Sequence, residues 1–363
     1  MAFLTGCLIL DAPASALNNR GKDPSASNDN VVVVKQIRVG KDSFPYVSAQ
    51  AFRYWLRTSL ETQEEAWEAA PVAKVAKAAY TDANPIRWWD DDLFGYMRAP
   101  SKAKDTKKPE GEESVLPTPL EKDTEITRIS PFRVGTFVGI SPGGIVSDFG
   151  TMTRQNDMPA PFEHEFYRSH LQGIISLDLA ATGTFFATKR VGYKNLDEVR
   201  RKEAEAEKLE QVTIRKQNAY RLPLTKRQSR ASTLVRGLAH LAGGAKQTLH
   251  LTDLTPAVAI LAVTKHGNNP FGRWFGPAGE ARVTATRFQA NAFKETTEWL
   301  HSQDELLSPI YVGWAEGFLD SEREGFRESA KASALTIKEG YPPALIQQLA
   351  ATLASPESAS WYD

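Results

Sequence analysis

The chain consists of short apolar runs separated by polar stretches that are rich in glycine, proline and asparagine. The runs at 3–10 and 31–39 predict strands, and the polar stretch at 11–30 between them predicts a long loop. The same kind of pattern predicts further strands at 126–140, 170–186, 256–264 and 281–290.

Apolar residues at a four-residue spacing predict helices. Ser48 has the character of an N-cap, and Phe52, Leu56 and Leu60 follow it at that spacing, so we expect an amphipathic helix here. Further helices are predicted at 64–80, where Pro71 interrupts the pattern, and at 197–216, 229–241, 320–332 and 343–354. This order of elements predicts an α+β fold with helices on one face of an antiparallel sheet.

Two segments lack a regular pattern. Residues 99–125 are rich in Lys, Glu and Pro without periodicity, which is typical of an insertion outside the packed core. In residues 141–169, glycines and prolines separate short apolar pieces, which predicts a projecting hairpin-like loop. Long loops in compact domains are usually functional.

The composition indicates an ordinary globular chain. Of its 363 residues 41% are hydrophobic and 24% are charged. The single cysteine, Cys7, excludes a disulfide framework and a Cys-based zinc site, and it favours a reducing cytosol. No apolar run approaches the roughly 20 residues that span a bilayer, and Met1–Leu10 lacks the basic region of a signal peptide. We therefore expect a soluble, cytoplasmic protein without a membrane partner.

The net charge of zero hides a strong segregation of charge. Residues 211–247 carry eight Lys or Arg and no acid, whereas 58–125 carries fifteen acids against nine bases, and 296–363 eleven against four. A one-sided cationic surface attracts polyanions. An ordinary solvated run of charge is the alternative interpretation.

The predicted helix that begins at Ser48 has a polar face with residue types that are common in nucleic-acid binding. Gln50, Arg53 and Arg57 lie on that face, away from the apolar stripe. The free N–H groups of a helix N-terminus bind phosphate without reading a base sequence. By itself this pattern is weak, because Ser is a common N-cap and Arg is common on solvated helices.

Several motifs in a fixed order resemble a known family. They are LDAPASALNNRG after the first strand, KQIRVGKDSFPYVSAQAFRYWLR, DDDLFGYM at 90–97, SPFRVGTFVGIS at 130–141, HEFYRSHLQGIISLDL at 164–179 and GGAKQ at 243–247. This set resembles the backbone subunit of type I CRISPR surveillance complexes (Cascade), in particular the DevR-like subgroup of type I-B systems. The resemblance extends to about residue 265.

The resemblance implies an α+β fold built on a modified RNA-recognition-motif (RRM), or ferredoxin-like, palm. In this interpretation 1–61 and 126–295 form a discontinuous palm, and 62–125 is a finger insertion. The loop at 142–166 is a thumb, and 296–363 is a C-terminal helical extension. The stacking aromatics of an ordinary RRM motif are not evident in the sequence.

The family's RNA contacts can be carried over by position. They imply a guide-RNA surface that grips the ribose-phosphate chain without reading bases. Its residues would be Asn18, Asn19, Arg38, Ser48, Gln50, Arg53, Arg57, Lys246 and Gln247. The thumb residues would be Phe149, Met152 and Arg154, of which Phe149 or Met152 could wedge against a displaced base.

The resemblance also implies partners. They are a guide crRNA, target DNA paired through that guide, and further copies of the chain in a helical filament. The large and small Cascade subunits and the proteins that bind the 5′ and 3′ ends of the crRNA would complete the complex. The sequence leaves open whether such a complex recruits a nuclease or transposition proteins. No cofactor, metal or catalytic activity is implied.

Four other interpretations compete with this one. Type III backbone subunits cleave target RNA with a loop Asp, and Asp23 and Asp29 lie on the corresponding loop. The Asp90–Asp92 cluster could hold Mg²⁺, although capping or solvation is the commoner role. Residues 163–170, with Glu163, His164, Glu165 and His170, do not have the HExxH spacing of a zinc site. A transcriptional regulator would need a helix-turn-helix pattern, which the sequence lacks.

Overall fold

A mixed sheet of twelve strands runs through the part of the chain that the structure describes. The computed structural model describes residues 1–22, 31–75, 78–99, 120, 124–152, 160–188, 194–214, 216–278 and 285–363. The main path of the sheet has the order β21-β20-β17-β1-β13-β11-β5-β4, and β2, β3, β10 and β12 attach beside it. The strands are β1 (Phe3–Ser15), β2 (Asn19–Lys22), β3 (Val31–Val34), β4 (Gln36–Val39), β5 (Asp42–Val47), β10 (Phe132–Val134), β11 (Phe137–Gly139), β12 (Gly144–Met152), β13 (Ala160–Asp178), β17 (Val258–Thr264), β20 (Ile310–Trp314) and β21 (Ile337–Gly340).

Strand β1 is the centre of the sheet. It pairs antiparallel with β13 on one side, from Phe3↔Asp178 to Asp11↔His170, and with β17 on the other. Its apolar run is buried on both faces because helices cover both faces of the sheet. Burial also raises the pKa of the Cys7 thiol to about 12, so this thiol is inert at neutral pH.

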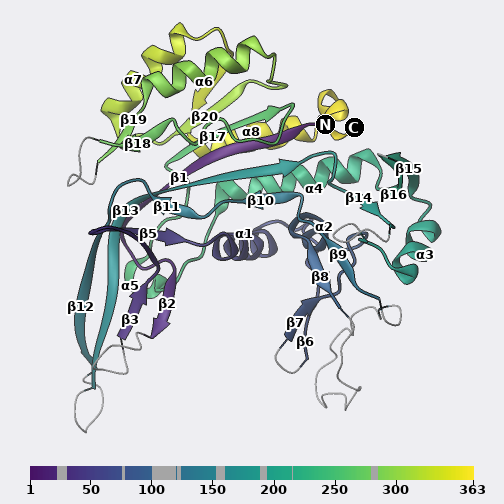
Figure 1. Cartoon of the computed structure of the whole chain (residues 1–363), viewed down its shortest axis with the longest axis horizontal. Helices are drawn as coiled ribbons and strands as arrows, with labels where there is room; N and C mark the ends of the chain where they lie inside the picture. Colours follow the sequence, from purple (N-terminus) through teal and green to yellow (C-terminus); the bar gives the residue numbers. More distant parts are fainter. Residues whose placement is uncertain are drawn as a thin grey trace.

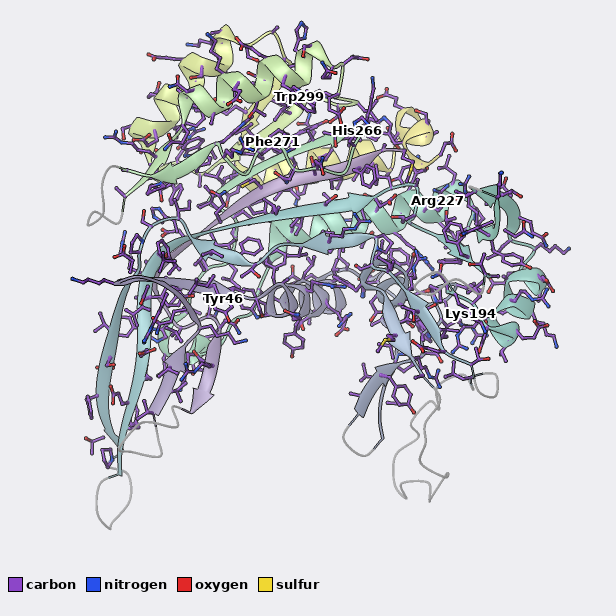
Figure 2. All side chains as sticks on the ribbon, viewed as in Figure 1. Tyr46, Lys194, Arg227, His266, Phe271 and Trp299 are labelled. Atoms are coloured by element: carbon purple, nitrogen blue, oxygen red, sulfur yellow. The ribbon has the colours of Figure 1, made fainter. Side chains whose placement is uncertain are left out.

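Helices lie on both faces of the sheet, and the expectation of helices on one face only is therefore wrong (Figure 1). Leu4 and Leu8 of β1 pack in one core with α1, α4 and α8, and Cys7 and Ile9 pack in a second core with α6 and α7. Phe271, labelled in Figure 2, belongs to the second core. These helices are α1 (Ala49–Gln63), α4 (Leu224–Gly237), α6 (Ala290–Ser302), α7 (Asp320–Ala332) and α8 (Pro342–Leu353). The sheet is also not purely antiparallel, because β20–β21 and β3–β13 pair in parallel.

Two projections extend to the same side of the sheet, with α1 between them (Figure 1). One is the hairpin formed by β12 and the first half of β13, paired from Gly144↔Arg168 to Met152↔Ala160. The predicted hairpin-like loop at 141–169 is thus confirmed. The other projection contains two small ladders, β6 (Val72–Val75) with β7 (Ala78–Thr81) and β8 (Tyr96–Arg98) with β9 (Ile126–Arg128).

Smaller elements complete the chain. A three-stranded sheet and α3 form a separate small core around Phe185, and β18 pairs with β19 beside the second core. These elements are α2 (Trp89–Phe94), β14 (Thr184–Phe186), α3 (Glu198–Ala206), β15 (Glu210–Ile214), β16 (Gln217–Arg221), η1 (Leu238–His240), α5 (Gln247–His250), β18 (Phe275–Pro277), β19 (Thr286–Phe288) and η2 (Pro356–Tyr362). No helix in the described ranges is long and apolar enough to span a lipid bilayer.

Several local predictions are confirmed and others are wrong. Ser48 caps α1, and the strand at 256–264 and the helices at 320–332 and 343–354 are present. The predicted helix at 64–80 is wrong, because the chain after Pro71 forms the β6–β7 hairpin. The predicted loop at 11–30 is wrong in part, because β1 continues to Ser15 and β2 follows. Most of 99–125 lies outside the described residues.

Other errors have a common cause, which is that one apolar pattern covers more than one element. The predicted strand at 126–140 is three short strands, since Pro131 and Gly135 interrupt it. The predicted helix at 197–216 ends at Ala206, and β15 follows. Helix α6 and strands β20 and β21 were not predicted. Because β20 and β21 lie within 296–363, the C-terminal segment is not wholly helical.

The cluster of Asp90, Asp91 and Asp92 is buried at the base of the second projection. Asp90 accepts a hydrogen bond from the Ala70 N–H (2.7 Å). Asp91 accepts from the Thr81 hydroxyl (2.5 Å). Asp90 and Asp91 thus accept backbone N–H groups, as the capping alternative expected, whereas solvation and a magnesium site have no support among the described residues.

Asp92 is the most constrained of the three, with no exposed surface. Its Oδ1 pairs with Arg128 of β9, and its Oδ2 lies 2.7 Å from Arg230 Nη1 of α4. The Gly183 N–H also donates to Oδ2 (3.0 Å). This Asp92 network joins α2, β9, α4 and the turn before β14 within the protein interior.

We expect Asp92→Ala to lower the free energy of unfolding by about 3–5 kcal/mol, because it leaves two buried guanidinium groups without their shared carboxylate. Urea unfolding followed by circular dichroism measures this loss. The control is Asp304→Ala, which removes a carboxylate that is 92% exposed and pairs with Lys265, and which should leave stability unchanged. Equal losses in the two variants would contradict a special role for the Asp92 network.

Asp91 should make stability depend on pH. Burial raises its pKa from 3.8 to about 7, against the opposing hydrogen bond from Thr81. The folded state therefore holds this proton more tightly than the unfolded state, and the resulting stability is full below about pH 4 and lost as pH rises to 7. We expect Asp91→Asn to gain stability relative to the natural chain over this range, by at most about 1.4 kcal/mol per pH unit. Chemical unfolding at several pH values measures the difference in stability between the variant and the natural chain. A difference that does not change with pH would refute the prediction.

Candidate nucleic-acid interface

Three predicted segments meet at the N-terminus of α1. The backbone N–H of Ser48 donates to Asn18 Oδ1 (3.0 Å), and the Ala245 N–H donates to the carbonyl of the neighbouring Leu17 (2.9 Å). Asn18 also accepts from the Lys35 N–H through its own carbonyl (2.9 Å). The segment after β1, the helix cap and the 243–247 loop are thus joined by hydrogen bonds, although the loop lies more than 190 residues after the other two in sequence.

The helix cap itself forms as predicted. Ser48 has extended backbone angles, and its hydroxyl accepts from the Ala51 N–H (3.3 Å). Gln50 is exposed on the first turn. No acidic residue lies in this first turn, so its partial positive charge is not offset there.

Arg53 and Arg57 are less free than the sequence suggests. Arg53 donates to the Phe94 carbonyl and to Ser130 Oγ (3.2 Å), and Arg57 Nε lies 3.4 Å from Asp90. Both guanidinium groups also lie over the Phe94 ring, at 5.5 and 4.9 Å. Burial, and secondarily Arg57, lower the pKa of Arg53. These two side chains bind α1 to α2, so part of their hydrogen-bonding and charge is used within the protein, and their role as RNA contacts stays a prediction.

The polar face of α1 also carries an aromatic side chain that the sequence analysis missed. Tyr54 is 64% exposed, four residues after Gln50 and three before Arg57, so the three share one face. An exposed aromatic ring among polar and cationic groups is a common platform for nucleobases. The signal was present in the sequence as an aromatic residue outside the apolar stripe.

The 243–247 loop has a conformation that only glycine allows at two positions. Gly243 has φ +139° and Gly244 has φ +94°. A Cβ at Gly243 would lie 2.8 Å from the Trp55 ring, and one at Gly244 would lie 2.7 Å from Leu17. The loop therefore lies directly on α1 and on the end of β1.

Lys246 and Gln247 follow these glycines. Lys246 adopts a left-handed conformation (φ 57°), and the Gln247 side chain donates to the Gly243 carbonyl. The fold thus sets both residues beside the α1 N-terminus, at a cost in backbone strain at Lys246.

Two other predicted contacts lie on adjoining strands. Arg38 is exposed on the β4–β5 hairpin, whose second strand leads directly into Ser48. Tyr46 on the same strand is labelled in Figure 2. Asn19 begins β2 opposite Val34, and its side-chain oxygen is buried without a hydrogen-bond partner.

The predicted thumb residues lie on the β12–β13 hairpin. Phe149 is 72% exposed on β12. Met152 ends β12 opposite Ala160, and its side chain is not among those described. Arg154 lies outside the described residues, as do Asp23 and Asp29 of the alternative cleavage hypothesis.

The acid-free segment at 211–247 does not supply one cationic surface. Arg227, labelled in Figure 2, donates to the carbonyls of Thr182 (2.8 Å) and Ala180 (3.0 Å), and burial lowers its pKa to about 10. Arg230 belongs to the Asp92 network, and Arg236 pairs with Glu64 (2.6 Å). The prediction of a cationic face is wrong for Arg227 and Arg230, which are buried, whereas Arg236 is partly exposed but paired, and Lys216 and Lys226 are exposed.

The metal interpretations have no support within the described ranges, where no group of three His, Cys, Asp or Glu side chains could hold an ion. Glu165 instead accepts from the Val34 N–H (2.9 Å). His170 contacts the Thr286 hydroxyl (2.9 Å) and lies 3.6 Å from Asp11.

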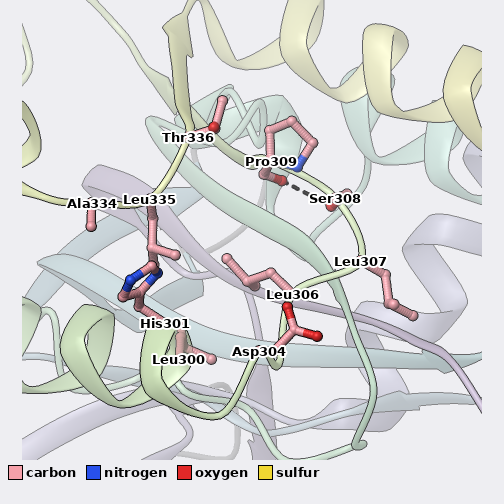
Figure 3. A pocket seen from close by; sticks show the side chains of 10 residues that line it. All are labelled: Leu300, His301, Asp304, Leu306, Leu307, Ser308, Pro309, Ala334, Leu335 and Thr336. Atoms are coloured by element: carbon pink, nitrogen blue, oxygen red, sulfur yellow. Dashed lines mark hydrogen bonds between the residues drawn. The ribbon is translucent and has the colours of Figure 1, made fainter.

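A hollow of about 340 Å³ lies far from this interface, on the opposite face of the sheet beside α6 (Figure 3). Leu300, Leu306 and Leu335 line it together with polar groups, and its titratable groups are His301 and Asp304. This pair, at the rim of a wide opening, makes no recognisable catalytic or cofactor site.

The sequence matches no known family model and no curated protein. The structure is similar to chains in two solved structures. One, described as a CRISPR RNA-guided surveillance complex, aligns over 96% of this chain and 99% of that chain, with 13% identity and a TM-score of 0.50. The other, described as the same kind of complex before nicking, aligns over 97% and 100%, with 12% identity and a TM-score of 0.52. At this identity the likeness concerns the fold, a mixed α/β arrangement on a large mixed sheet.

The glycine contacts generate a test of the loop geometry. We expect Gly243→Ala to lower the free energy of unfolding by about 1–3 kcal/mol, because the new methyl group meets the Trp55 ring at an unfavourable φ. Gly325→Ala is the matched control, since it adds the same group in open space within α7 and should stabilise by about 0.5–1 kcal/mol. Thermal and urea unfolding distinguish the two, and a neutral Gly243→Ala would contradict the close packing of the loop.

Proposed function

We propose that this protein is a guide-RNA-binding backbone subunit of a type I CRISPR surveillance complex, of the type I-B Cascade kind. The observation that carries the proposal is the convergence of Asn18, the Ser48 helix cap and the 243–247 loop on one site. The likeness of the whole chain to chains of RNA-guided surveillance complexes supports it.

The chemistry of this site suits a ribose-phosphate chain. The α1 N-terminus offers partial positive charge, Gln50 offers an amide, and Lys246 offers a cation. The guanidinium groups of Arg53 and Arg57, further along α1, add to the positive electrostatic potential of the site. These groups contact backbone rather than base edges, which suits a protein that must hold any guide sequence. The RRM-like palm, the finger and the thumb are part of the same proposal.

Assembly follows from the two projections. In the proposed complex several copies bind one crRNA in a helical filament, and the β12–β13 hairpin of one copy contacts the next. The guide is then presented for pairing with target DNA, with the large, small and crRNA-end subunits as further partners. We propose no catalytic role, and the carboxylates of the Asp90–Asp92 cluster are bound within the protein.

We expect Gln50→Glu combined with Lys246→Glu to weaken binding of a crRNA-length RNA by at least tenfold without unfolding the chain, since both side chains lie at the surface of the interface. The logarithm of the binding constant should fall with the logarithm of salt, and each lost phosphate contact should reduce that slope by about 0.7. Fluorescence anisotropy with two RNAs of unrelated sequence measures both quantities.

Lys294→Glu is the matched control, because Lys294 is exposed on α6, on the opposite face of the sheet. It should leave RNA affinity and salt slope nearly unchanged. If the two variants lose affinity equally, general electrostatic attraction explains binding and the proposed interface is wrong. If the natural protein binds no RNA, the proposed function is wrong.

A further inference from the structure

Two cations of α1 share one aromatic ring. The Cζ atoms of Arg53 and Arg57 lie 5.5 and 4.9 Å from the centre of the ring of Phe94, the last residue of α2. Like charges four residues apart on a helix repel each other. The face of an aromatic ring attracts cations, so Phe94 can hold both guanidinium groups in spite of that repulsion.

The Phe94 ring is itself fixed by the core. It is 3% exposed and packs edge to face against Trp67 and Phe132, with ring centroids 6.2 and 5.9 Å apart. Gly95 follows with φ +70°, and a Cβ there would lie 2.8 Å from the Ser130 nitrogen. Glycine therefore allows the chain after β9 to approach the end of α2 closely. The ring is a rigid support for the two arginines.

The two arginines depend on this ring to different degrees. Arg53 also donates through Nη2 to the Phe94 carbonyl and to Ser130 Oγ. The Arg57 side chain is 31% exposed, and its Nε lies 3.4 Å from Asp90. Contact with a ring face uses none of the N–H donors of a guanidinium group. The ring can therefore fix the place of Arg57 without occupying the donors that a phosphate would need.

A fixed side chain has an advantage in binding. A long arginine side chain loses rotamer freedom when it binds a phosphate, and this loss weakens the binding. A side chain that the protein already holds in place loses less. Arg57 shares the polar face of α1 with Gln50 and Tyr54, so the advantage would apply at the predicted interface.

We propose that Phe94 is a positioning residue for RNA binding. Its ring holds Arg53 and Arg57 in the arrangement that meets the phosphates of an RNA strand, and so lowers the entropic cost of binding. Phe94 itself does not touch the RNA, because its side chain is buried. This inference rests on the proposed function and on the prediction that both arginines contact RNA. Ordinary packing of arginine on an aromatic residue is the competing interpretation.

The test removes the ring and keeps an apolar side chain. Phe94→Leu should weaken binding of a crRNA-length RNA by about fivefold to tenfold, and Phe94→Tyr, which keeps the ring, should retain most of the affinity. Arg53→Gln combined with Arg57→Gln should weaken binding at least as much. Adding Phe94→Leu to that pair should cause no further loss, because a positioning residue acts only through the groups that it positions. Fluorescence anisotropy measures each affinity.

Phe185→Leu is the matched control. It removes a buried ring that lies 4.8 Å from the guanidinium carbon of Arg128, a member of the Asp92 network. It should lower the melting temperature and leave RNA affinity unchanged. If Phe94→Leu does not fold, Arg57→Lys replaces it, since this variant keeps the charge and leaves the core intact. A lysine loses the planar guanidinium group, so affinity should fall about threefold, and unchanged affinity would overturn the proposal.

The outcomes separate the positioning role from packing. Unchanged RNA affinity in Phe94→Leu with a lower melting temperature would overturn the positioning role. So would an equal loss of affinity with and without the two arginines, or a loss that Phe94→Tyr shares in full. Unchanged affinity after replacement of both arginines would overturn it as well, and would leave the proposed function intact. Failure of the natural protein to bind RNA would instead refute the proposed function.

Discussion

A fully buried carboxylate between two guanidinium groups holds several elements of this structure together. Asp92 is wholly buried, and its charge is compensated by Arg128 from β9 and Arg230 from α4. Because a buried charge is costly unless it is paired and hydrogen-bonded, the three side chains can be accommodated only together. The second projection, the long helix behind the sheet and the turn before β14 are therefore fixed relative to one another. Helix α1 is joined to the same group of elements, because Asp90 on the same short helix as Asp92 pairs with Arg57 of α1.

Local patterns in the sequence predicted the elements whose causes are local. The Ser48 cap, the stripe of Phe52, Leu56 and Leu60, and the projecting hairpin needed no knowledge of distant residues. The helix at 64–80 failed because an interrupted apolar pattern fits either a helix or a hairpin of β-branched residues. Helix α6 was missed although Phe293, Thr297 and Leu300 lie on its buried face, so that signal was available.

The candidate site, too, could be predicted from local sequence patterns only in part. Ser48, Asn18 and the 243–247 loop could be identified as a group only through the family resemblance, because their contacts connect distant parts of the chain. The sequence also could not show which cations are free. Arg230 and Arg236 find their acids 138 and 172 residues away, so a count of charge along the chain mistakes structural arginines for surface charge. A guanidinium group has five donors, and Arg53 uses only one of its nitrogens for its hydrogen bonds to Phe94 and Ser130.

Strand β13 gives the hairpin a mechanical property. Its nineteen residues run without a break from the Met152↔Ala160 pair into the middle of the sheet, a length of about 60 Å. In the sheet it pairs with β1 over most of that strand. A pull on the hairpin along its axis would therefore load many backbone hydrogen bonds in shear at once, rather than opening them one after another. The hairpin should act as a stiff rod anchored in the core, which transmits tension to the centre of the protein instead of bending at its base.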